Sequence, residues 1–374
     1  MKILFYDWSL HIIGGGQKVN CKIMEHLAKK NNVDVLTLYP LNKKTLEGLY
    51  KVNLSKINFS YLTDNKKIHS SLMKLFLSKR VSELSKNYDL FFNADGQEAI
   101  KPLAKKNIMY CHFFERLWYR SPKNFSDLVK LTFLCLLRKF YGNFSKKYKI
   151  YCNSFLTKKW LKKEWDVDAK IIYPFVELPK KVLFKKKNLI ITVGRLTSDK
   201  NYEFFIELFK KFYDSSKKNY NAIIVGAVND DSLDYYNELK KLIKDYPIEI
   251  KKNLNTEQLS ELYSKSKVLI SAKGLNIDEN KDPTSVENFG MTVVEAMAHS
   301  CIPLAVNKGG YKESIVNGKN GFLFENKEEA LKKLNLLLDN EELRIKMSKQ
   351  AIEDSKKFSL EKMQKEIDKL VKEL

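Results

Sequence analysis

Two glutamates, Glu287 and Glu295, have seven residues between them, and those residues are suited to binding an anion. Gly290 lets the backbone turn sharply into an apolar-periodic run at 291–297, which predicts a helix. The first N–H groups of such a helix have no partner within it and form a ready anion site. If the helix begins near Met291, Glu295 lies on its second turn and Glu287 on the loop before it. Both carboxylates can then face one cleft.

This arrangement suits a ligand that is anionic in the middle and rich in hydroxyl groups at both ends. One carboxylate would bind a sugar, the amides a diphosphate and the other carboxylate a ribose, which describes a nucleotide sugar. The alternative is a pair of solvated acids beside an ordinary core helix. The helix start at Gly290, the Gly309–Gly310 turn after the next strand and Gly321 before another apolar triplet favour the binding site.

A pair of cations earlier in the same half could hold phosphates. The apolar run at 189–193 predicts a strand, and Arg195 and Lys200 follow it closely. Two cations five residues apart at the end of a strand can clamp the two phosphates of a departing nucleoside diphosphate. They remove the electrostatic need for a metal, and the acids at 276–282 and 230–231 match no metal site. We therefore expect neither a metal ion nor another cofactor.

The first half opens with a glycine-rich loop, which includes Gly15 and Gly16, between a predicted strand at 2–6 and a predicted helix at 17–30. Such a loop brings backbone close to a ligand. It lacks the G-x-G-x-x-G spacing, and no acid ends the next strand, so a dehydrogenase is not favoured. His112 follows a predicted strand at 107–111, where a parallel strand delivers side chains to a binding site.

Strands and helices alternate through both halves, which predicts an α/β protein built from two doubly wound, Rossmann-like domains. Pro174, Pro179 and a lysine cluster at 185–187 mark a linker. We expect one domain at 1–178, a second, nucleotide-sugar-binding domain at 179–358 and a last helix at 359–374.

Three runs in the second half resemble the donor-site signature of glycosyltransferase family 4, the retaining transferases of the GT-B architecture. They are Glu287-Asn288-Phe289-Gly290, Val294-Glu295-Ala296-Met297-Ala298 and Gly309-Gly310-Tyr311-Lys312-Glu313. The V-G-R-L run followed by Lys200 matches the diphosphate-binding pattern of that family. The resemblance implies the GT-B fold, with two Rossmann-like domains that face across a cleft. It also implies that the N-terminal domain at 1–178 binds the acceptor and that the last helix at 359–374 packs back on this domain.

The resemblance also implies roles for individual residues. Glu287 would hold sugar hydroxyls beside the reacting carbon, Glu295 would hold the ribose, and Arg195 with Lys200 would stabilise the leaving diphosphate. The nucleotide-sugar site would further include Gly15, Gly16, Asn253, Leu254, Phe289, Gly290, Met291 and Thr292, with the base held largely by backbone groups around Asn253. The run Ser271-Ala272-Lys273-Gly274 differs from the usual H-A-K-G by its first residue.

His112 belongs to a run, 108–113, that is similar to the Y-x-H-x-P run of lipid-linked-oligosaccharide mannosyltransferases. In those enzymes the histidine meets the donor sugar near the reacting carbon, so the resemblance implies a catalytic role for His112. The run departs from the pattern at Phe114, where those relatives have proline. Together with Glu287, Arg195 and Lys200, His112 completes the expected catalytic set.

The basic charge of the chain is concentrated in the first half. Residues 1–178 carry a formal charge of +17 and residues 179–374 only +5. The apolar stretch at 128–144 reads either as a core helix with a basic edge or as an amphipathic helix at a membrane interface. Aromatic and basic residues lie just upstream of it: Phe113, Phe114, Arg116, Trp118, Tyr119 and Arg120. We expect contact with an anionic membrane and a lipid-linked or membrane-associated glycan acceptor.

Scattered cysteines and the lack of a long apolar core near Met1 indicate a cytoplasmic protein, peripheral on the membrane. Two alternatives stay open. One is a GT-B relative that cleaves a nucleotide sugar, such as an epimerase or phosphorylase. The other is a protein without catalysis that binds nucleotide sugar, an anionic membrane or nucleic acid, although no nucleic-acid motif is present.

Overall fold

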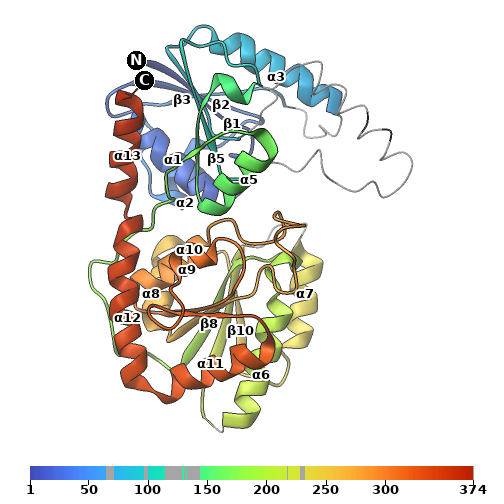
Figure 1. Ribbon diagram of the computed structural model, residues 1–374, viewed down its shortest axis with the longest axis vertical. Coiled ribbons are helices and arrows are strands. Elements are labelled where there is room, and N and C mark those ends of the chain that lie inside the picture. The colour runs from blue at the N-terminus through green and yellow to red at the C-terminus, as the bar shows by residue number, and fades with distance from the viewer. Residues whose placement is uncertain are drawn as a thin grey trace. The chain divides into compact units, whose positions relative to one another are not determined.

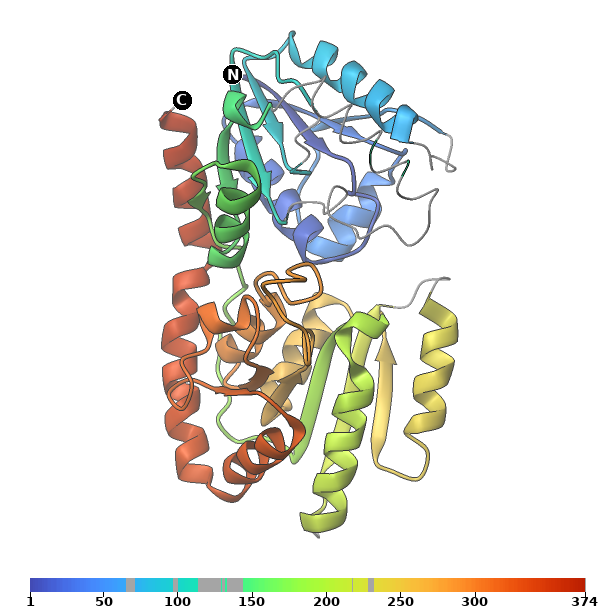
Figure 2. The same cartoon turned by 45° about the vertical axis from the view of Figure 1, so that its right-hand side comes forward.

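The computed structural model describes residues 1–64, 71–96, 100–113, 129, 132, 144–216, 218–227 and 232–373. By its internal contacts the chain divides into two compact units (Figures 1 and 2). The first unit comprises Met1–Tyr173 and Gln364–Leu374, and the second comprises Pro174–Met363. Nearly all of the predicted amphipathic stretch at 128–144 lies outside the described residues, as do Phe114, Arg116, Trp118, Tyr119, Arg120 and Asp230–Asp231.

The first unit is built on a seven-stranded sheet of order β3-β2-β1-β4-β5-β6-β7, in which every neighbouring pair is parallel. Its strands are β1 Lys2–Asp7, β2 Asn32–Thr37, β3 Asn58–Tyr61, β4 Leu90–Asn93, β5 Lys106–Cys111, β6 Lys149–Cys152 and β7 Lys170–Ile171. Its helices are α1 Gly15–Leu27, α2 Lys43–Tyr50, α3 Ser71–Ser85, α5 Phe155–Trp165 and most of α13 Leu360–Lys372.

The second unit holds a six-stranded parallel sheet of order β10-β9-β8-β11-β12-β13. Its strands are β8 Leu189–Arg195, β9 Asn221–Ala227, β10 Ile248–Lys252, β11 Val268–Ser271, β12 Ile302–Val306 and β13 Phe322–Phe324. Its helices are α6 Tyr202–Ser216, α7 Leu233–Leu242, α8 Thr256–Lys265, α9 Met291–Ala298, α10 Tyr311–Ser314, α11 Lys327–Asp339 and α12 Glu341–Ser355. Helix α6 packs against α7 and α11, while α9 packs against α8 and α12.

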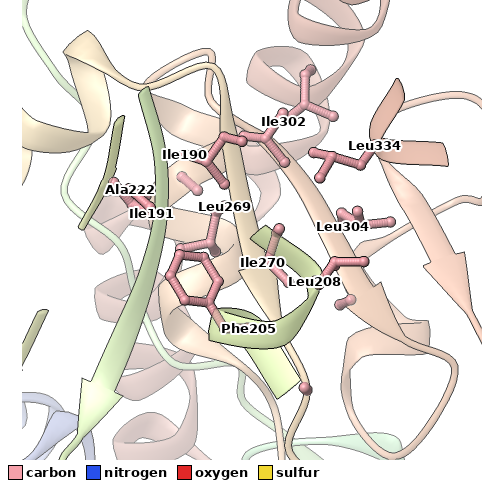
Figure 3. Packing of buried hydrophobic residues seen from close by; sticks show 14 of the residues in the cluster. Ile190, Ile191, Phe205, Leu208, Ala222, Leu269, Ile270, Ile302, Leu304 and Leu334 are labelled. Carbon is pink, nitrogen blue, oxygen red and sulfur yellow. The ribbon is translucent and has the colours of Figure 1, made fainter. Parts of the chain in front are cut away.

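The core of the second unit follows from strands that are apolar on both sides. The central strands read Leu-Ile-Ile-Thr-Val and Val-Leu-Ile-Ser, which is typical of a parallel sheet covered by helices on both faces. Figure 3 shows Ile190, Leu269 and Ile302 of three neighbouring strands and Phe205 and Leu208 of α6, which all belong to one buried hydrophobic cluster. This packed layer fixes where each strand ends, and hence where the loops after the strands begin.

Both sheets contain a point at which the strand order reverses. In the first unit it lies between β1 and β4, and in the second between β8 and β11. Loops that leave the carboxyl ends of two such strands diverge to opposite faces and leave room for a ligand between them. The glycine-rich loop follows β1, while Arg195 ends β8 and Lys273 follows β11.

The α/β class, the parallel sheets and the two Rossmann-like arrangements that the sequence predicts are confirmed. Helix α1 begins at Gly15, two residues earlier than expected, because Gly14 adopts the extended conformation that precedes a helix. Helix α5 spans the predicted residues, since the Ser154 side chain accepts the backbone N–H of Thr157 and caps it. None of the described helices is long and apolar enough to cross a membrane.

Candidate functional site

The candidate site lies at the carboxyl ends of β8 and β11, where the strand order of the second unit reverses. Strand β8 ends at Arg195 and leads through a single 3-10 turn, Ser198–Lys200, into α6. Strand β11 ends at Ser271 and leads through Lys273 to the long loop that carries Glu287. Residues that are 87 positions apart in the sequence therefore meet across one strand-to-strand step.

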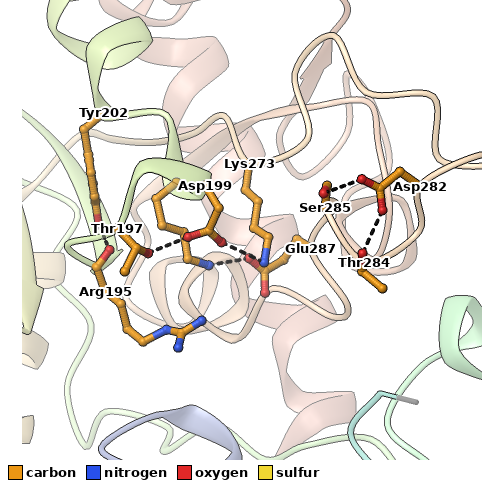
Figure 4. Close-up of polar contacts among 10 residues, drawn as sticks. Arg195, Thr197, Asp199, Tyr202, Lys273, Asp282, Thr284, Ser285 and Glu287 are labelled. Atoms are coloured by element: carbon orange, nitrogen blue, oxygen red, sulfur yellow. Dashed lines mark hydrogen bonds and ion pairs between the residues drawn. The ribbon is translucent and has the colours of Figure 1, made fainter. Parts of the chain in front are cut away.

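Two ion pairs cross this step (Figure 4). Lys200 Nζ lies 2.7 Å from Glu287 Oε2, and Lys273 Nζ lies 3.1 Å from Asp199 Oδ2. The Lys200 and Glu287 side chains are only 19% and 20% exposed, so water screens their attraction weakly. Removing one partner of such a pair would leave the other charge poorly compensated. The lysine of each loop thus holds the acid of the other loop in place.

The neighbouring lysines lower the pKa values of Glu287 and Asp199. Burial would raise the pKa of Glu287, but the charges of Lys200 and Lys273 overcome that effect and hold it below its usual value of 4.5. Burial likewise opposes ionisation of Asp199, whereas Thr197, Lys273 and Lys200 lower its pKa. Both carboxylates are therefore ionised at neutral pH, and the two ion pairs together carry no net charge.

Arg195 contrasts with these paired charges. Its side chain is exposed, and it makes no ion pair with any residue that the structure describes. Its backbone carbonyl accepts a hydrogen bond of 3.1 Å from the buried hydroxyl of Tyr202, which anchors the end of β8 to α6. The guanidinium is therefore an uncompensated cation on a fixed backbone beside the two ion pairs, which is the arrangement an incoming phosphate requires.

The loop around Glu287 is held by glycine backbone. Gly309 has a φ of +57°, and a Cβ atom there would lie 2.3 Å from the carbonyl oxygen of Glu287. The N–H of Gly310 donates to that same oxygen at 2.7 Å. A residue with a side chain at 309 would push the Glu287 loop away, so the Gly309–Gly310 turn sets the position of Glu287.

Helix α9 begins at Met291, as the sequence predicts, and Gly290 before it has a φ of +88°. No side chain caps this helix. Met291 and Thr292 are partly exposed, so the N-terminal backbone N–H groups are available to a ligand and attract negative charge. Glu295, one turn on, accepts a hydrogen bond of 3.1 Å from the Tyr263 hydroxyl of α8. Its carboxylate thus contacts a different neighbour from that of Glu287.

The remaining predicted binding residues of the second unit lie outside the two ion pairs and the start of α9. They are Phe289, Asn253 and Leu254. Phe289 is only 2% exposed, and its ring packs edge-on against Phe358, with 5.2 Å between the ring centroids. The residue is therefore part of the core beside the site. Asn253 follows β10 with a φ of +53°, and its N–H donates to Gly226 at 3.1 Å, which fixes the loop that Leu254 continues.

In the first unit the structure brings His112, Gly16 and Asn20 together. His112 follows β5, and its Nε2 lies 2.9 Å from Asn20 Oδ1 in α1. A Cβ atom on Gly16 would lie 3.6 Å from the imidazole ring, so the start of α1 covers one side of His112. Gly15 is the first residue of α1 and is exposed.

Several residues of these clusters were not predicted from the sequence. Asp199 stands directly before Lys200, and an acid next to a candidate phosphate-binding lysine is a signal that could have indicated it. Lys273, whose run departs from the family pattern, proves to interact with Asp199. No sequence pattern indicated that Tyr263 or Asn20 would contact a predicted site residue. Within the described ranges, no group of three or more His, Cys, Asp or Glu residues is placed to hold a metal ion.

Comparison with known proteins gives a consistent result. The family model of the glycosyl transferases group 1 matches residues 176–354. Over 279 residues the chain is 27% identical to the GDP-Man:Man(3)GlcNAc(2)-PP-Dol alpha-1,2-mannosyltransferase of Dictyostelium discoideum, an alignment that covers 68% of this chain and 53% of that protein. The chain therefore spans about half the length of this relative.

Two further relatives match along nearly their whole length. An uncharacterized glycosyltransferase of Haemophilus influenzae is 27% identical, with 97% of each chain covered. The crystal structure of Anabaena HepE in complex with UDP and glucose superimposes with a TM-score of 0.74 at 19% identity, with all of both chains covered. At that identity the structural likeness shows the fold alone, and this fold is the GT-B arrangement of two parallel-sheet domains.

Proposed function

We propose that this chain, whose residues 176–354 match the model of the glycosyl transferases group 1, moves a sugar, with retention, from a UDP- or GDP-linked donor to a lipid-linked or membrane-associated glycan. The mannosyltransferase from Dictyostelium is named for a GDP-linked donor and a dolichol-linked acceptor, and HepE was solved with UDP and glucose. The observation that carries the proposal is the paired cluster of Lys200, Glu287, Lys273 and Asp199 beside the exposed Arg195.

The donor's diphosphate would bind at Arg195, Lys200 and the first N–H groups of α9. Two cations and a helix N-terminus supply the positive potential that the leaving phosphate needs. For this reason we propose transfer without a metal ion. The test is turnover in the presence of EDTA, which should equal turnover in untreated buffer, and a loss that Mg²⁺ or Mn²⁺ restores would contradict the proposal.

Glu287 would bind hydroxyl groups of the donor sugar. Without ligand its carboxylate is paired with Lys200 at 2.7 Å. A diphosphate competes for the same lysine, so ligand binding would release one carboxylate oxygen for the sugar while Lys273 still holds the charge nearby. Glu295, held by Tyr263, would bind the ribose hydroxyls. The base would meet the backbone around Asn253.

The reaction we propose has no protein nucleophile. The bond from the anomeric carbon to the phosphate oxygen breaks, and a bond from that carbon to the acceptor oxygen forms on the same face. The acceptor hydroxyl gives its proton to the departing phosphate oxygen. Arg195 and Lys200 stabilise the charge that develops on that oxygen, which is the largest single contribution the site can make.

Contact with a membrane surface also belongs to the proposal. It is supported by the formal charge of +17 on residues 1–178, because a basic surface is attracted to anionic lipids. The test is sedimentation with vesicles of anionic and of neutral phospholipid. We expect binding to the anionic vesicles that weakens as salt is added, and equal binding to both kinds would contradict it.

The function is tested by incubating the protein with UDP- and GDP-linked sugars and a polyprenyl-diphosphate-linked acceptor. We expect sugar transfer, with the anomeric configuration of the donor kept in the product. Release of free sugar or of an epimer without transfer would favour a nucleotide-sugar-cleaving enzyme. A thermal-shift panel separates these outcomes from a pure binder, which would respond to oligonucleotides rather than to nucleoside diphosphates.

A further inference from the structure

A hydrogen-bonded network in the first unit joins the end of β1, helix α1 and the residue that follows β5. Asn20 Nδ2 in α1 donates to Asp7 Oδ2 at the end of β1 over 2.7 Å. Asn20 Oδ1 lies 2.9 Å from Nε2 of His112, which follows β5. Asp7 and Asn20 are 0% and 1% exposed, so this network is shielded from water. A buried polar chain of this kind needs a partner for each group, which constrains its protons.

The donors and acceptors determine the direction of each hydrogen bond. The second oxygen of Asp7 accepts the Ser9 backbone N–H at 2.9 Å and the Ser9 hydroxyl at 3.1 Å. A carboxylate that accepts on both oxygens requires the NH2 group of Asn20 to face it. The amide oxygen of Asn20 must then face His112, and because that oxygen can only accept, the proton of the imidazole lies on Nε2.

This assignment leaves the other ring nitrogen as an acceptor. In a neutral imidazole with its proton on Nε2, Nδ1 has a free lone pair. No residue among those described hydrogen-bonds to Nδ1 of His112. Burial lowers the pKa of His112 to about 4, so the ring is neutral at pH 7. The ring is also held in place, because Tyr110 lies edge-on to it with 5.0 Å between the centroids and Gly16 covers another side.

We infer that Asn20 is a positioning residue that, together with Asp7, commits His112 to accept a hydrogen bond at Nδ1 from a substrate hydroxyl. The inference rests on the proposed sugar transfer, since both the donor sugar and the glycan acceptor bring hydroxyl groups. Asn20 itself touches no substrate in this account. It acts through His112, by fixing which nitrogen carries the proton.

The other titratable groups around the network do not compete with this role. They are Asp7 of β1, Cys21 of α1, Tyr50 of α2 and Tyr110 of β5. Burial raises the pKa of Cys21 and of Tyr110, and it raises the pKa of Tyr50 to about 12. Burial also raises the pKa of Asp7, against the hydrogen bonds from Asn20 and Ser9 that lower it. The thiol and the two phenols therefore stay neutral from pH 6 to 9.

The first test reads the tautomer directly and does not depend on activity. In 15N-labelled full-length protein, two-bond correlations identify which ring nitrogens carry protons, and the His112 signals are those lost in His112→Gln. We expect a proton on Nε2 and none on Nδ1 between pH 6 and 8. A proton on Nδ1 in the unaltered protein would overturn the inference, even if sugar transfer is demonstrated.

The second test is the pH profile of Asn20→Asp. A carboxylate at this position accepts from His112 but cannot donate to Asp7, so it draws a second proton onto the ring and removes the acceptor at Nδ1. We expect turnover to fall at least tenfold at pH 6.5 and to recover as the pH rises to 9, whereas the unaltered enzyme changes less than threefold. A flat profile with full turnover would contradict the inference.

Controls separate this inference from the proposed function and from misfolding. UDP or GDP binding should be unchanged in Asn20→Asp, which shows that the second unit is intact, and an unchanged circular dichroism spectrum should show that the first unit is folded. His11→Gln removes an exposed imidazole from the loop after β1 and should keep the profile of the unaltered enzyme. A rise in KM for the donor alone assigns the hydroxyl to the donor sugar, and a rise for the acceptor alone assigns it to the glycan. If no donor is turned over, the proposed function fails while the tautomer measurement still decides the placement of the proton.

Discussion

Both units place polar residues near the point where the strand order of the sheet reverses. The two regions differ in the charge of those residues. At the β8/β11 step of the second unit, four charged side chains form two ion pairs beside the exposed Arg195. Near the β1/β4 step of the first unit, the neutral amide of Asn20 links one buried acid, Asp7, to the neutral imidazole of His112. One region is built from charges and the other from oriented dipoles.

The difference indicates which part of a substrate each region suits. Paired charges that are partly exposed can exchange partners when an anion arrives, and they favour a diphosphate. A buried dipolar network cannot compensate a charge, but it can fix one acceptor for a hydroxyl group. We therefore assign stabilisation of the diphosphate charge to the second unit and recognition of a substrate hydroxyl group to the first.

Removing the buried acid of the charged region should have the largest effect. In Glu287→Gln the ion pair with Lys200 is lost, and the sugar loses its charged hydrogen-bond acceptor. We expect turnover to fall about a thousandfold with an unchanged circular dichroism spectrum. Glu261→Gln, which breaks an exposed ion pair with Lys265, should change turnover less than twofold. A fully active Glu287→Gln enzyme would remove Glu287 from the site.

Removing the exposed cation should have the next largest effect. In Arg195→Ala the leaving phosphate loses one of its two cations, so turnover should fall about a hundredfold, as when one oxyanion donor is removed. The loss should appear in kcat more than in the donor KM, because charge develops in the transition state. Lys241→Ala, which removes an exposed cation of α7, is the matched control. Equal turnover in both variants would contradict the role of Arg195.

The backbone support of the charged region can be tested with two glycines. Gly309 and Gly318 both have positive φ, but a Cβ atom meets the Glu287 carbonyl at 2.3 Å in the first case and nothing within 4 Å in the second. Gly318→Ala should cost about 1 kcal/mol of unfolding free energy from backbone strain alone. Gly309→Ala should cost about 3 kcal/mol, because steric overlap is added. Equal losses in chemical denaturation would show that the close approach is unimportant.

The two regions should also differ in acid. The pKa of His112 is lowered from 6.5 to about 4, so the unfolded chain takes up this proton first and stability falls as the pH drops from 6.5 towards 4. The pKa of Glu287 is lowered from 4.5, so its contribution is lost only below about pH 4.5. Asp7, with a raised pKa, acts in the opposite sense.

Thermal unfolding of the unaltered protein and of His112→Gln isolates the histidine, because Asp7 is common to both. Between pH 7 and 5 the unaltered protein should lose a few °C more in Tm than the variant. Parallel Tm curves would show that His112 is not held neutral, and would remove the contrast between the two regions.

Much of this fold could be predicted from the sequence, because local signals determine it. Buried parallel strands appear as continuous apolar runs, so β11 and β12 were predicted to the residue. Helix α2 and the polar strand β3 were not predicted, since Asn58–Tyr61 is largely exposed and lacks an apolar run. The observed start of α1 differs from the predicted one because the glycines there tolerate both an extended and a helical backbone.

The candidate site divides in the same way. The helix start at Met291 follows from Gly290 and the apolar period, so it could be predicted from the local sequence. The Lys200–Glu287 pair and the Asn20–His112 contact join residues 87 and 92 positions apart, and no local pattern specifies such a pairing. Contacts of that range depend on the order of strands in a sheet, which the sequence alone leaves open.

The most direct test of the account is a crystal structure of the protein with UDP or GDP bound. The account predicts diphosphate oxygens within hydrogen-bond distance of Arg195, Lys200 and the first N–H groups of α9, with the ribose at Glu295. Lys200 should have moved from Glu287 towards the phosphate. A diphosphate bound elsewhere, or one in contact with neither Arg195 nor Lys200, would contradict the central claim.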